Sequence, residues 1–399
     1  IFAARDPLGV RPLFYIEEKG DIAFASEVKA LMHLEGTIKA FPPGHYYFQK
    51  KFIPYFHLFK EKNYTYQKPN LDAVFKNIHD LLYNAVEKRL HADAPLGFLL
   101  SGGVDSSLVC AIAAKVLKKP LETFSVGLSV DPIDLKYAKI VANHIGSNHC
   151  EIIFTTEQAI NHVPELIKQL ETFDITTIRA SIGMSLVCKE IKSKTNVKAL
   201  LTGEVSDELF GYKYTDFAPN AQEFQEESLK RVRELYFYDI LRADRCIAFH
   251  SLEARVPFSD KQFVEYVLSL DPELKMNTYN MGKYLLRKSF DHSNYLPHEI
   301  LYRDKAAFSD AVGHSMVDEL KKYAEQKYSD EELKKAQEKY SHCPPISKES
   351  LWYREIFESF YPGKSYLIPS FWMPNQKWNN CNVNDPSARV LANYGKSGE

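Results

Sequence analysis

One short stretch, residues 97–107, constrains the fold of this chain more than any other. The stretch starts within an apolar run, Leu96 to Leu100, whose length suits a buried strand. Two glycines follow, and the apolar spacing predicts a helix over 108–117. Ser106 and Ser107 stand where helix-capping residues are expected. A strand that turns through glycines into a helix makes an anion site, because free N–H groups and the positive end of the helix dipole converge there.

The residues of this turn exclude two familiar phosphate-binding loops. It is not GxxxxGK[ST], because no lysine follows the glycines, and it is not GxGxxG. The pattern SGGxDS, from Ser101 to Ser106, resembles the pyrophosphate loop of enzymes that split ATP between its α and β phosphates. The alternative is an ordinary strand-turn-helix connection capped by serine, which a Gly-Gly pair alone would favour. The strand before the turn and the helix after it favour the nucleotide site.

Composition limits the class of protein. Apolar residues make up 45% and charged residues 26% of 399 residues, as in a soluble globular chain for which two domains are expected. A formal net charge of −2 argues against nucleic-acid binding through phosphate neutralisation. Six cysteines without a CxxC pair indicate a reduced, cytoplasmic protein with no zinc framework. No run of about eighteen apolar residues predicts a membrane span, and no signal peptide is visible.

Secondary-structure patterns divide the chain into three parts. Residues 1–60 are predicted to be β-rich with one short helix, and residues 61–70 are polar and lack periodicity. Residues 71–399 alternate strands with helices and become mostly helical beyond 217, while the last sixty residues show no clear period. The strands predicted in this part cover 96–100, 121–126, 149–154 and 197–201. Alternation of this kind predicts an α/β fold with a doubly wound parallel sheet.

Polar side chains follow several of these strands and are candidates for chemistry. Ligands of such sheets bind beyond the carboxyl ends of the strands, so residues after Leu100, Val126 and Leu201 should share one crevice. Asp105 and Asp207 could hold Mg²⁺, which takes one or two protein carboxylates together with phosphate oxygens. The acidic residues of 202–208 could instead be an ordinary charge bias at a helix N-terminus.

A third polar segment offers hydroxyls and a guanidinium. Thr176 and Thr177 precede Arg179, whose planar fork suits a small carboxylate. A capping threonine followed by a solvent-exposed arginine is the plainer interpretation.

Together these segments resemble the glutamine-dependent asparagine synthetases of class B type, and the resemblance covers nearly the whole chain. The matching segments are 5–15, 26–31, 98–107, 123–128, 172–179, 201–210, 241–258, 303–310 and 385–389. The resemblance implies a C-terminal remnant of an N-terminal-nucleophile glutaminase domain over 1–60 and a linker over 61–70. It implies an asparagine synthetase domain with the pyrophosphate-loop ATP-binding fold over 71–399. The glutaminase cysteine is expected upstream of residue 1.

The resemblance also implies a reaction. The side-chain carboxylate of aspartate attacks the α-phosphorus of ATP, pyrophosphate leaves, and ammonia displaces AMP from β-aspartyl-AMP to give asparagine. Ammonia comes from glutamine in the intact enzyme. The implied ligands are aspartate, ATP, ammonia and Mg²⁺, with no nucleic acid or membrane partner, and a homodimer is left open.

Carried over residue by residue, the resemblance assigns roles to named positions. The ATP-binding positions are Leu100, Ser101, Gly102, Gly103, Asp105, Ser106, Ser107, Val126, Thr202 and Gly203. The positions around aspartate are Thr176, Thr177, Arg179 and Arg255. Glu204 matches the acidic residue that forms the intermediate and takes a proton from ammonia, and Lys305 matches the lysine that meets the phosphates. Asp105 and Asp207 would hold the metal ion.

The chain departs from the family pattern at three places. Thr202 replaces a common Ser, and the segment Phe210-Gly211-Tyr212 looks one residue shorter than in many relatives. The third is in the motif that usually reads Gly-Glu-Gly-Ser-Asp-Glu. Residue 205 is Val, and a β-branched residue disfavours positive φ. Either the backbone there is ordinary or the loop is altered. Two other functions therefore stay open: an adenylating enzyme with a different carboxylate substrate, such as a β-lactam-forming synthetase, and a binding protein that keeps the fold without catalysis.

Overall fold

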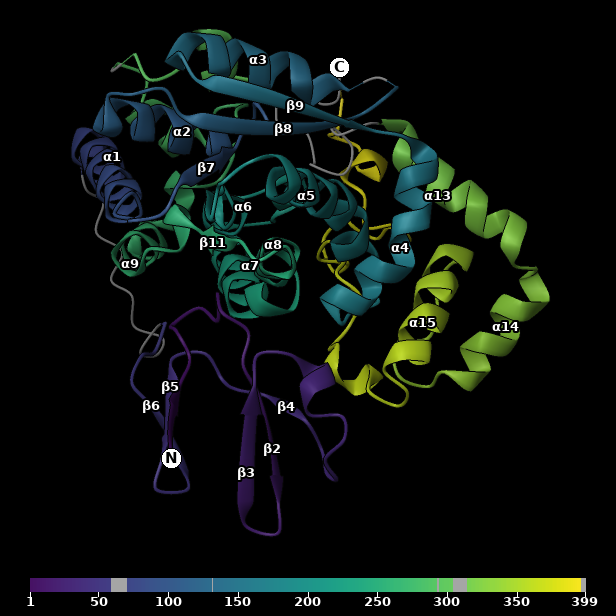
Figure 1. The fold of residues 1–399 in the computed structure, drawn as a ribbon. Helices are drawn as coiled ribbons and strands as arrows, with labels where there is room; N and C mark the ends of the chain where they lie inside the picture. The colour runs from purple at the N-terminus through teal and green to yellow at the C-terminus, as the bar shows by residue number, and fades with distance from the viewer. Residues whose placement is uncertain (59–69, 131, 293, 304–313, 396–399) are drawn as a thin grey trace.

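A computed structural model describes residues 1–58, 70–130, 132–292, 294–303 and 314–395. Figure 1 shows a small β-rich part at the N-terminus and a larger part built around a twisted sheet. The predicted linker lies outside the described residues except for Asn70. Asn70 caps the first long helix, because its side chain accepts a hydrogen bond from the backbone N–H of Asp72.

The central sheet has five strands, all parallel. Its members are β7 (Leu96–Leu99), β8 (Glu122–Leu128), β9 (Asn148–Phe154), β10 (Ala199–Leu201) and β11 (Glu253–Arg255). They lie in the order β11-β10-β7-β8-β9, and the register sets Phe98 beside both Leu201 and Thr123. The chain runs outward from β7 to β9 and then returns to the other side of β7. The predicted doubly wound parallel sheet is confirmed, with β11 as a short edge strand that the sequence analysis did not predict.

Helices cover both faces of this sheet, as Figure 1 shows. The helices are α1 (Leu71–Lys88), α2 (Val104–Leu117), α3 (Ile133–Ile145), α4 (Thr156–Leu170), α5 (Ile175–Lys194), α6 (Ser206–Phe210), α7 (Ala221–Glu234), α8 (Asp239–Phe249), α9 (Lys261–Ser269), α10 (Tyr284–Ser289), α11 (His298–Leu301), α13 (His314–Lys327), α14 (Asp330–Lys339) and α15 (Lys348–Phe360). Side chains from α1, α2, α3 and α9 form one apolar core, and those of α4, α5, α8, α13 and α15 form another. None of the described helices is long and apolar enough to cross a membrane.

Two helical predictions in the larger part of the chain differ from the structure. Capping was expected at Ser106 and Ser107, but α2 begins at Val104, with Gly103 at the capping position and no side-chain cap. Both serines therefore lie inside the first turn of α2, among the residues whose N–H groups form the N-terminal end of the helix. The last sixty residues contain α15, which lacks a clear period in sequence because it is buried on several sides, at Leu351, Trp352 and Tyr353 among others.

The N-terminal part consists of two antiparallel sheets. One contains β1 (Phe2–Ala4), β5 (His45–Phe48) and β6 (Lys51–Pro54), and the other contains β2 (Phe14–Glu18), β3 (Asp21–Ala25) and β4 (Lys39–Ala40). Aromatic rings join them, since the ring centroids of Tyr15 and Phe52 lie 4.6 Å apart and those of Phe24 and Tyr47 lie 5.4 Å apart. The predicted short helix after Ser26 is only a 3₁₀ turn, Val28–Ala30.

Helix α8 attaches the N-terminal part to the larger part. Its Asp244 accepts a hydrogen bond from Arg11, and its Arg245 donates to Glu171 at 2.8 Å. Glu171 in turn accepts the backbone N–H groups of Val28 and Lys29, at 2.8 and 3.0 Å. Because these partners are mostly buried, the contacts fix how the two parts meet.

Candidate functional site

A cavity of about 210 Å³ opens at the carboxyl ends of β7, β8 and β10. It lies where the strand order reverses, which is where ligands bind to sheets of this kind. The predicted site residues that line it are Leu100, Ser101, Gly103, Asp105, Ser106, Val126, Thr176, Arg179, Thr202, Gly203, Glu204 and Asp207. The expectation that the segments after three strands share one crevice is confirmed.

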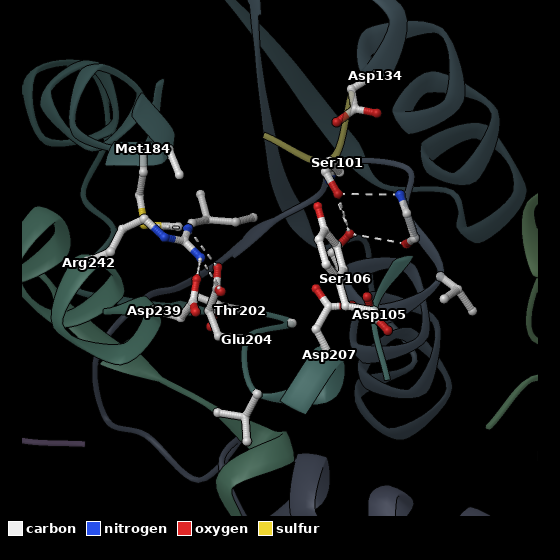
Figure 2. A pocket seen from close by; sticks show the side chains of 18 of the residues that line it. Ser101, Asp105, Ser106, Asp134, Met184, Thr202, Glu204, Asp207, Asp239 and Arg242 are labelled. Carbon is white, nitrogen blue, oxygen red and sulfur yellow. Dashed lines mark hydrogen bonds and ion pairs between the residues drawn. The ribbon is translucent and has the colours of Figure 1, made fainter. Parts of the chain in front are cut away.

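Figure 2 shows two groups of side chains in this cavity. One group surrounds the glycine turn and includes Ser101, Ser106, Asp105 and Asp207; the other surrounds Arg242 and includes Glu204. The two groups lie at opposite sides of the view. One end of the cavity is lined by the serines and aspartates near the glycine turn, and the other by the ion pairs of Arg242.

The glycine turn is held in shape by its own serines. The backbone N–H of Ser101 donates to Ser106 Oγ at 3.2 Å, and the hydroxyls of these two residues lie 3.0 Å apart. The N–H of Gly103 donates to Ser101 Oγ at 3.3 Å. These bonds close the turn over the N-terminus of α2, whose dipole favours an anion.

Two glycines let backbones approach more closely than any side chain would allow. Gly102 has φ +75°, and a Cβ there would lie 2.5 Å from the backbone nitrogen of Ala138 in α3. A Cβ on Gly203 would lie 2.6 Å from the backbone nitrogen of Ser106. Gly203 therefore allows the segment after β10 to touch the first turn of α2, which brings the two polar loops into one site.

We expect Gly203→Ala to reduce the free energy of unfolding by about 1–3 kcal/mol, because the new methyl group must push two backbones apart. Gly103→Ala is the matched control, since a Cβ at Gly103 meets only Ser101 Oγ, at 3.4 Å. Urea unfolding of both variants measures the difference. Equal stability of the two variants would contradict this account of the close approach.

Lys283 links the two candidate metal ligands and was missed by the sequence analysis. Its ammonium lies 2.8 Å from both oxygens of Asp105 and 2.7 Å from Asp207 Oδ1. Ser206 adds a hydrogen bond to Asp105 Oδ1 at 2.7 Å. Lys283 comes 178 residues after Asp105, and no local pattern marks it, so only the fold brings these groups together.

Glu204 is held by a buried arginine at the other end of the cavity. Arg242 of α8 donates to Glu204 Oε1 at 3.2 Å and to Oε2 at 2.5 Å, and it also reaches Asp239 Oδ1 at 3.2 Å. Burial, together with the charges of Asp239 and Asp207, raises the pKa of the neighbouring Glu208 well above its usual value. The site therefore combines a carboxylate that is ion-paired with a buried arginine and a second acid that favours its proton.

The structure turns part of the Thr176–Arg179 segment toward the cavity. Thr176 lines it, and its buried hydroxyl has no hydrogen-bond partner among the described residues, as is also true of Thr202. Buried polar atoms of this kind are normally satisfied, so two of them beside a cavity are consistent with a bound polar ligand. Thr177 instead donates to Asp174 Oδ2 at 2.8 Å as part of the cap of α5.

Arg179 lines the cavity but is fully engaged with protein carboxylates. It donates to Glu349 at 2.8 and 2.6 Å and to Asp385 at 3.0 and 2.9 Å. Asp385 precedes residues 386–388, which form part of the cavity wall. The guanidinium fork thus fastens the C-terminal segment over the site.

The remaining predicted positions lie elsewhere. Gly102, Ser107 and Thr177 are adjacent to the cavity but are not among the described residues that line it. The structure does not bring Arg255 to the cavity, since its guanidinium donates to the carbonyls of Arg89 and His91 at 2.7 and 3.0 Å. Lys305 lies outside the described residues.

Comparison with known proteins agrees with this geometry. The asparagine synthase family model matches residues 77–222 and 216–385, and a glutamine amidotransferase domain model matches residues 1–65. The chain belongs to the asparagine synthase family. It is similar to asparagine synthetase [glutamine-hydrolyzing] of Gallus gallus, at 45% identity, and of Homo sapiens, at 41%. Each alignment covers 99% of this chain and 75% of the relative.

Among solved structures, NMN synthetase from Francisella tularensis matches 77% of this chain and 100% of its own. The TM-score is 0.32 and the identity 13%, a likeness too low to bear on function.

The departure at residue 205 from the family pattern has a structural consequence. Val205 adopts φ +81° and ψ −14°, and its side chain is buried in the core beside α6. The first of the two expectations, an ordinary backbone, is therefore wrong. A β-branched side chain is strained in this region, so the site loop stores conformational energy that a glycine would not.

We expect Val205→Gly to change the free energy of unfolding by less than about 1 kcal/mol, because relief of about 1–3 kcal/mol of strain offsets a similar loss of apolar burial. Val256→Gly is the control: Val256 is equally buried but has φ −118°, so nothing offsets its loss. Thermal unfolding of both variants checks the difference. If Val205→Gly lost as much stability as Val256→Gly, the proposal that the backbone at residue 205 is strained would be contradicted.

Proposed function

We propose that this chain forms asparagine from aspartate and ammonia with ATP, through a β-aspartyl-AMP intermediate. The observation that carries the proposal is the convergence of two segments in one cavity: the glycine turn over the N-terminus of α2, and the segment after β10 that presents Glu204. Relatives at 41–45% identity that are named asparagine synthetases support it.

The glycine turn supports the role of ATP site. Ser101, Gly103 and Ser106 line the cavity at the N-terminus of α2, whose helix dipole would stabilise charge that builds on the α-phosphate and on departing pyrophosphate. Leu100, Val126 and Thr202 provide walls that would accommodate the nucleoside. We propose that Gly102 and Ser107 maintain the shape of the turn and do not contact the nucleotide.

The donor set also suits Mg²⁺. Asp105 and Asp207 already converge on one cation, the ammonium of Lys283, so the pair can accommodate positive charge. No group of three or more metal-ligating side chains occurs in the described parts of the chain, and two carboxylates suffice where phosphate oxygens complete the shell. Bound Mg²⁺ would neutralise the phosphates, and Lys283 would supply a second positive charge nearby.

Glu204 is proposed as the catalytic carboxylate. Arg242 holds it by two hydrogen bonds at the wall of the cavity, where it would accept a proton from ammonia as the carbon–nitrogen bond forms. The neighbouring Glu208 has a raised pKa, so that group favours its protonated form and Glu204 is left as the proton acceptor. We propose Lys305 as a further phosphate contact on the basis of the family pattern.

The aspartate end is proposed to lie near Thr176, whose hydroxyl has no hydrogen-bond partner among the described residues. Thr177 fixes the start of α5, and Arg179 contributes by holding the wall at 385–388. For Arg255 we propose a supporting role through its hydrogen bonds to the carbonyls of Arg89 and His91.

Pyrophosphate release with ATP, aspartate and ammonium chloride tests the function. Release should depend on aspartate, and mass spectrometry should identify AMP and asparagine in equal amounts. Pyrophosphate that forms with another carboxylic acid but not with aspartate would indicate a different adenylating enzyme. Tight ATP binding without any release would indicate a binding protein.

A further inference from the structure

A second hollow, of about 80 Å³, lies beside the main cavity and has no role in the function proposed above. It shares Tyr212, Arg287 and Arg303 with the main cavity, and Lys283 stands between the two. We call it the Lys275 pocket; its charged lining residues are Lys213, Asp216, Lys275, Lys283, Arg287 and Arg303. Its volume is several times the minimum of about 10–15 Å³ that holds one water molecule.

Most of the positive charge around this pocket already has a partner. Lys283 pairs with Asp105 and Asp207, and Arg303 donates to Asp134 at 2.9 Å. Asp216 accepts a hydrogen bond from Asn393 at 3.0 Å and lies near Lys213.

Lys275 is different, because its buried ammonium forms no ion pair with a described residue, although the charge of Asp271 acts on it from farther away. The residue is 5% exposed, and its hydrogen bond goes to the neutral amide oxygen of Gln225, at 2.7 Å. Gln225 is itself fixed, since its amide nitrogen donates to the carbonyl of Leu268 at 2.8 Å. No carboxylate of the described residues lies within ion-pair distance of Lys275. A buried charge without a counter-ion is costly, so such a group beside a hollow calls for an anionic ligand.

We propose that the Lys275 pocket binds an inorganic oxyanion of the phosphate class. Several cations around a small hollow suit an anion with several oxygen atoms better than a single-atom anion, because each oxygen can meet a separate donor. Burial lowers the pKa of Lys275 to about 7, and the charge of Asp271, which acts in the opposite direction, does not offset it. The ligand could be free phosphate, or pyrophosphate that leaves the main cavity across the shared wall.

The pocket also accounts for the position of Lys283. With Asp105 and Asp207 on one side and the Lys275 pocket on the other, this ammonium faces both sites where phosphate groups would lie. Only the assignment of pyrophosphate as the source rests on the proposed function, since binding of free phosphate requires no catalysis.

Titration of the 399-residue chain with sodium phosphate, followed by calorimetry at constant ionic strength, tests this site. We expect saturable binding that is at least tenfold weaker in Lys275→Met. Ser106→Ala changes the glycine turn but not this pocket, so the phosphate binding that depends on Lys275 should persist in that variant. A parallel titration with pyrophosphate separates the two sources. Binding that is lost in Ser106→Ala and retained in Lys275→Met would assign all of it to the main cavity and overturn the proposal.

Crystals of the unsubstituted chain soaked in selenate provide a measurement that needs no variant. Anomalous scattering should locate selenium within hydrogen-bond reach of Lys275 Nζ. Selenate found at the glycine turn but absent from Lys275 would refute the site, even if Lys275→Met failed to fold. Because both measurements read binding rather than turnover, their failure is distinguishable from failure of the proposed reaction.

Discussion

Glu204→Gln is expected to lower the rate of asparagine formation by more than about 100-fold, the effect typical of removing a preorganised electrostatic group. Glutamine keeps the size of the side chain and can still accept a hydrogen bond from Arg242. It cannot take a proton from ammonia, and it leaves the buried guanidinium with less negative charge. The measurement is the steady-state rate with ATP, aspartate and ammonium, beside the melting temperature of the same sample.

The matched control for this prediction is Asp239→Asn, which removes the other carboxylate on the same guanidinium. Asp239 lies 3.2 Å from Arg242, against 2.5 Å for the nearer oxygen of Glu204. We expect a smaller loss of rate in Asp239→Asn. Equal losses would mean that the ion-pair cluster matters as a whole and that Glu204 has no special role. Near-normal turnover in Glu204→Gln would show that the catalytic assignment is wrong.

The second large effect is expected in Arg179→Met, which should reduce the free energy of unfolding by about 3–5 kcal/mol. The substitution removes the four hydrogen bonds to Glu349 and Asp385 and leaves the carboxylate of Glu349, 2% exposed, without its cation. Urea unfolding at pH 7 measures the loss. A loss below about 1 kcal/mol would show that the network contributes no more than a surface ion pair.

This stability difference should also depend on pH. Burial alone would raise the pKa of Asp385, but hydrogen bonds and the charge of Arg179 outweigh burial and lower the pKa well below its usual range. A carboxylate with a depressed pKa stabilises the folded state fully above its unfolded pKa, about 3.9, and progressively less as pH falls below that value. The gap between the unsubstituted chain and Arg179→Met should therefore narrow below about pH 4.

Kinetics of the same variant separate two roles for Arg179. Glu349→Gln breaks the network from the side that does not line the cavity, so it serves as the matched control. If Arg179 acts by holding the wall at 385–388, both substitutions should raise the KM for aspartate by a similar factor. A much larger increase in Arg179→Met would show that its guanidinium meets aspartate directly.

Local signals in the sequence predicted the elements but not their exact ends. The α3 helix over 133–145 ends at Gly146, which adopts φ +65° as a capping glycine does, and α4 begins at Thr155 with a complete capping box. These signals depend on neighbouring residues only. Capping at Ser106 was predicted incorrectly, because α2 begins at Val104, with Gly103 at the capping position and no side-chain cap.

Some residues of the candidate site could likewise be predicted from local sequence, and others could not. Ser101, Gly103, Glu204 and Thr176 could be predicted, because each lies in a short motif at the end of a strand or the start of a helix. Lys283 and Arg242 could not, since each acts on a residue far away in sequence and resembles any other basic side chain near a helix.

The sequence by itself determined the family, the alternation of strands and helices, and the glycine turn, because these follow from periodicity and from backbone conformations that few residues allow. Tertiary structure alone decided which charges meet. It paired Arg179 with Glu349 and Asp385, paired Lys283 with Asp105 and Asp207, and left Lys275 without an ion pair among the described residues. The reason is that an ion pair depends on distance through space and on burial, and neither is encoded in the spacing of residues along the chain.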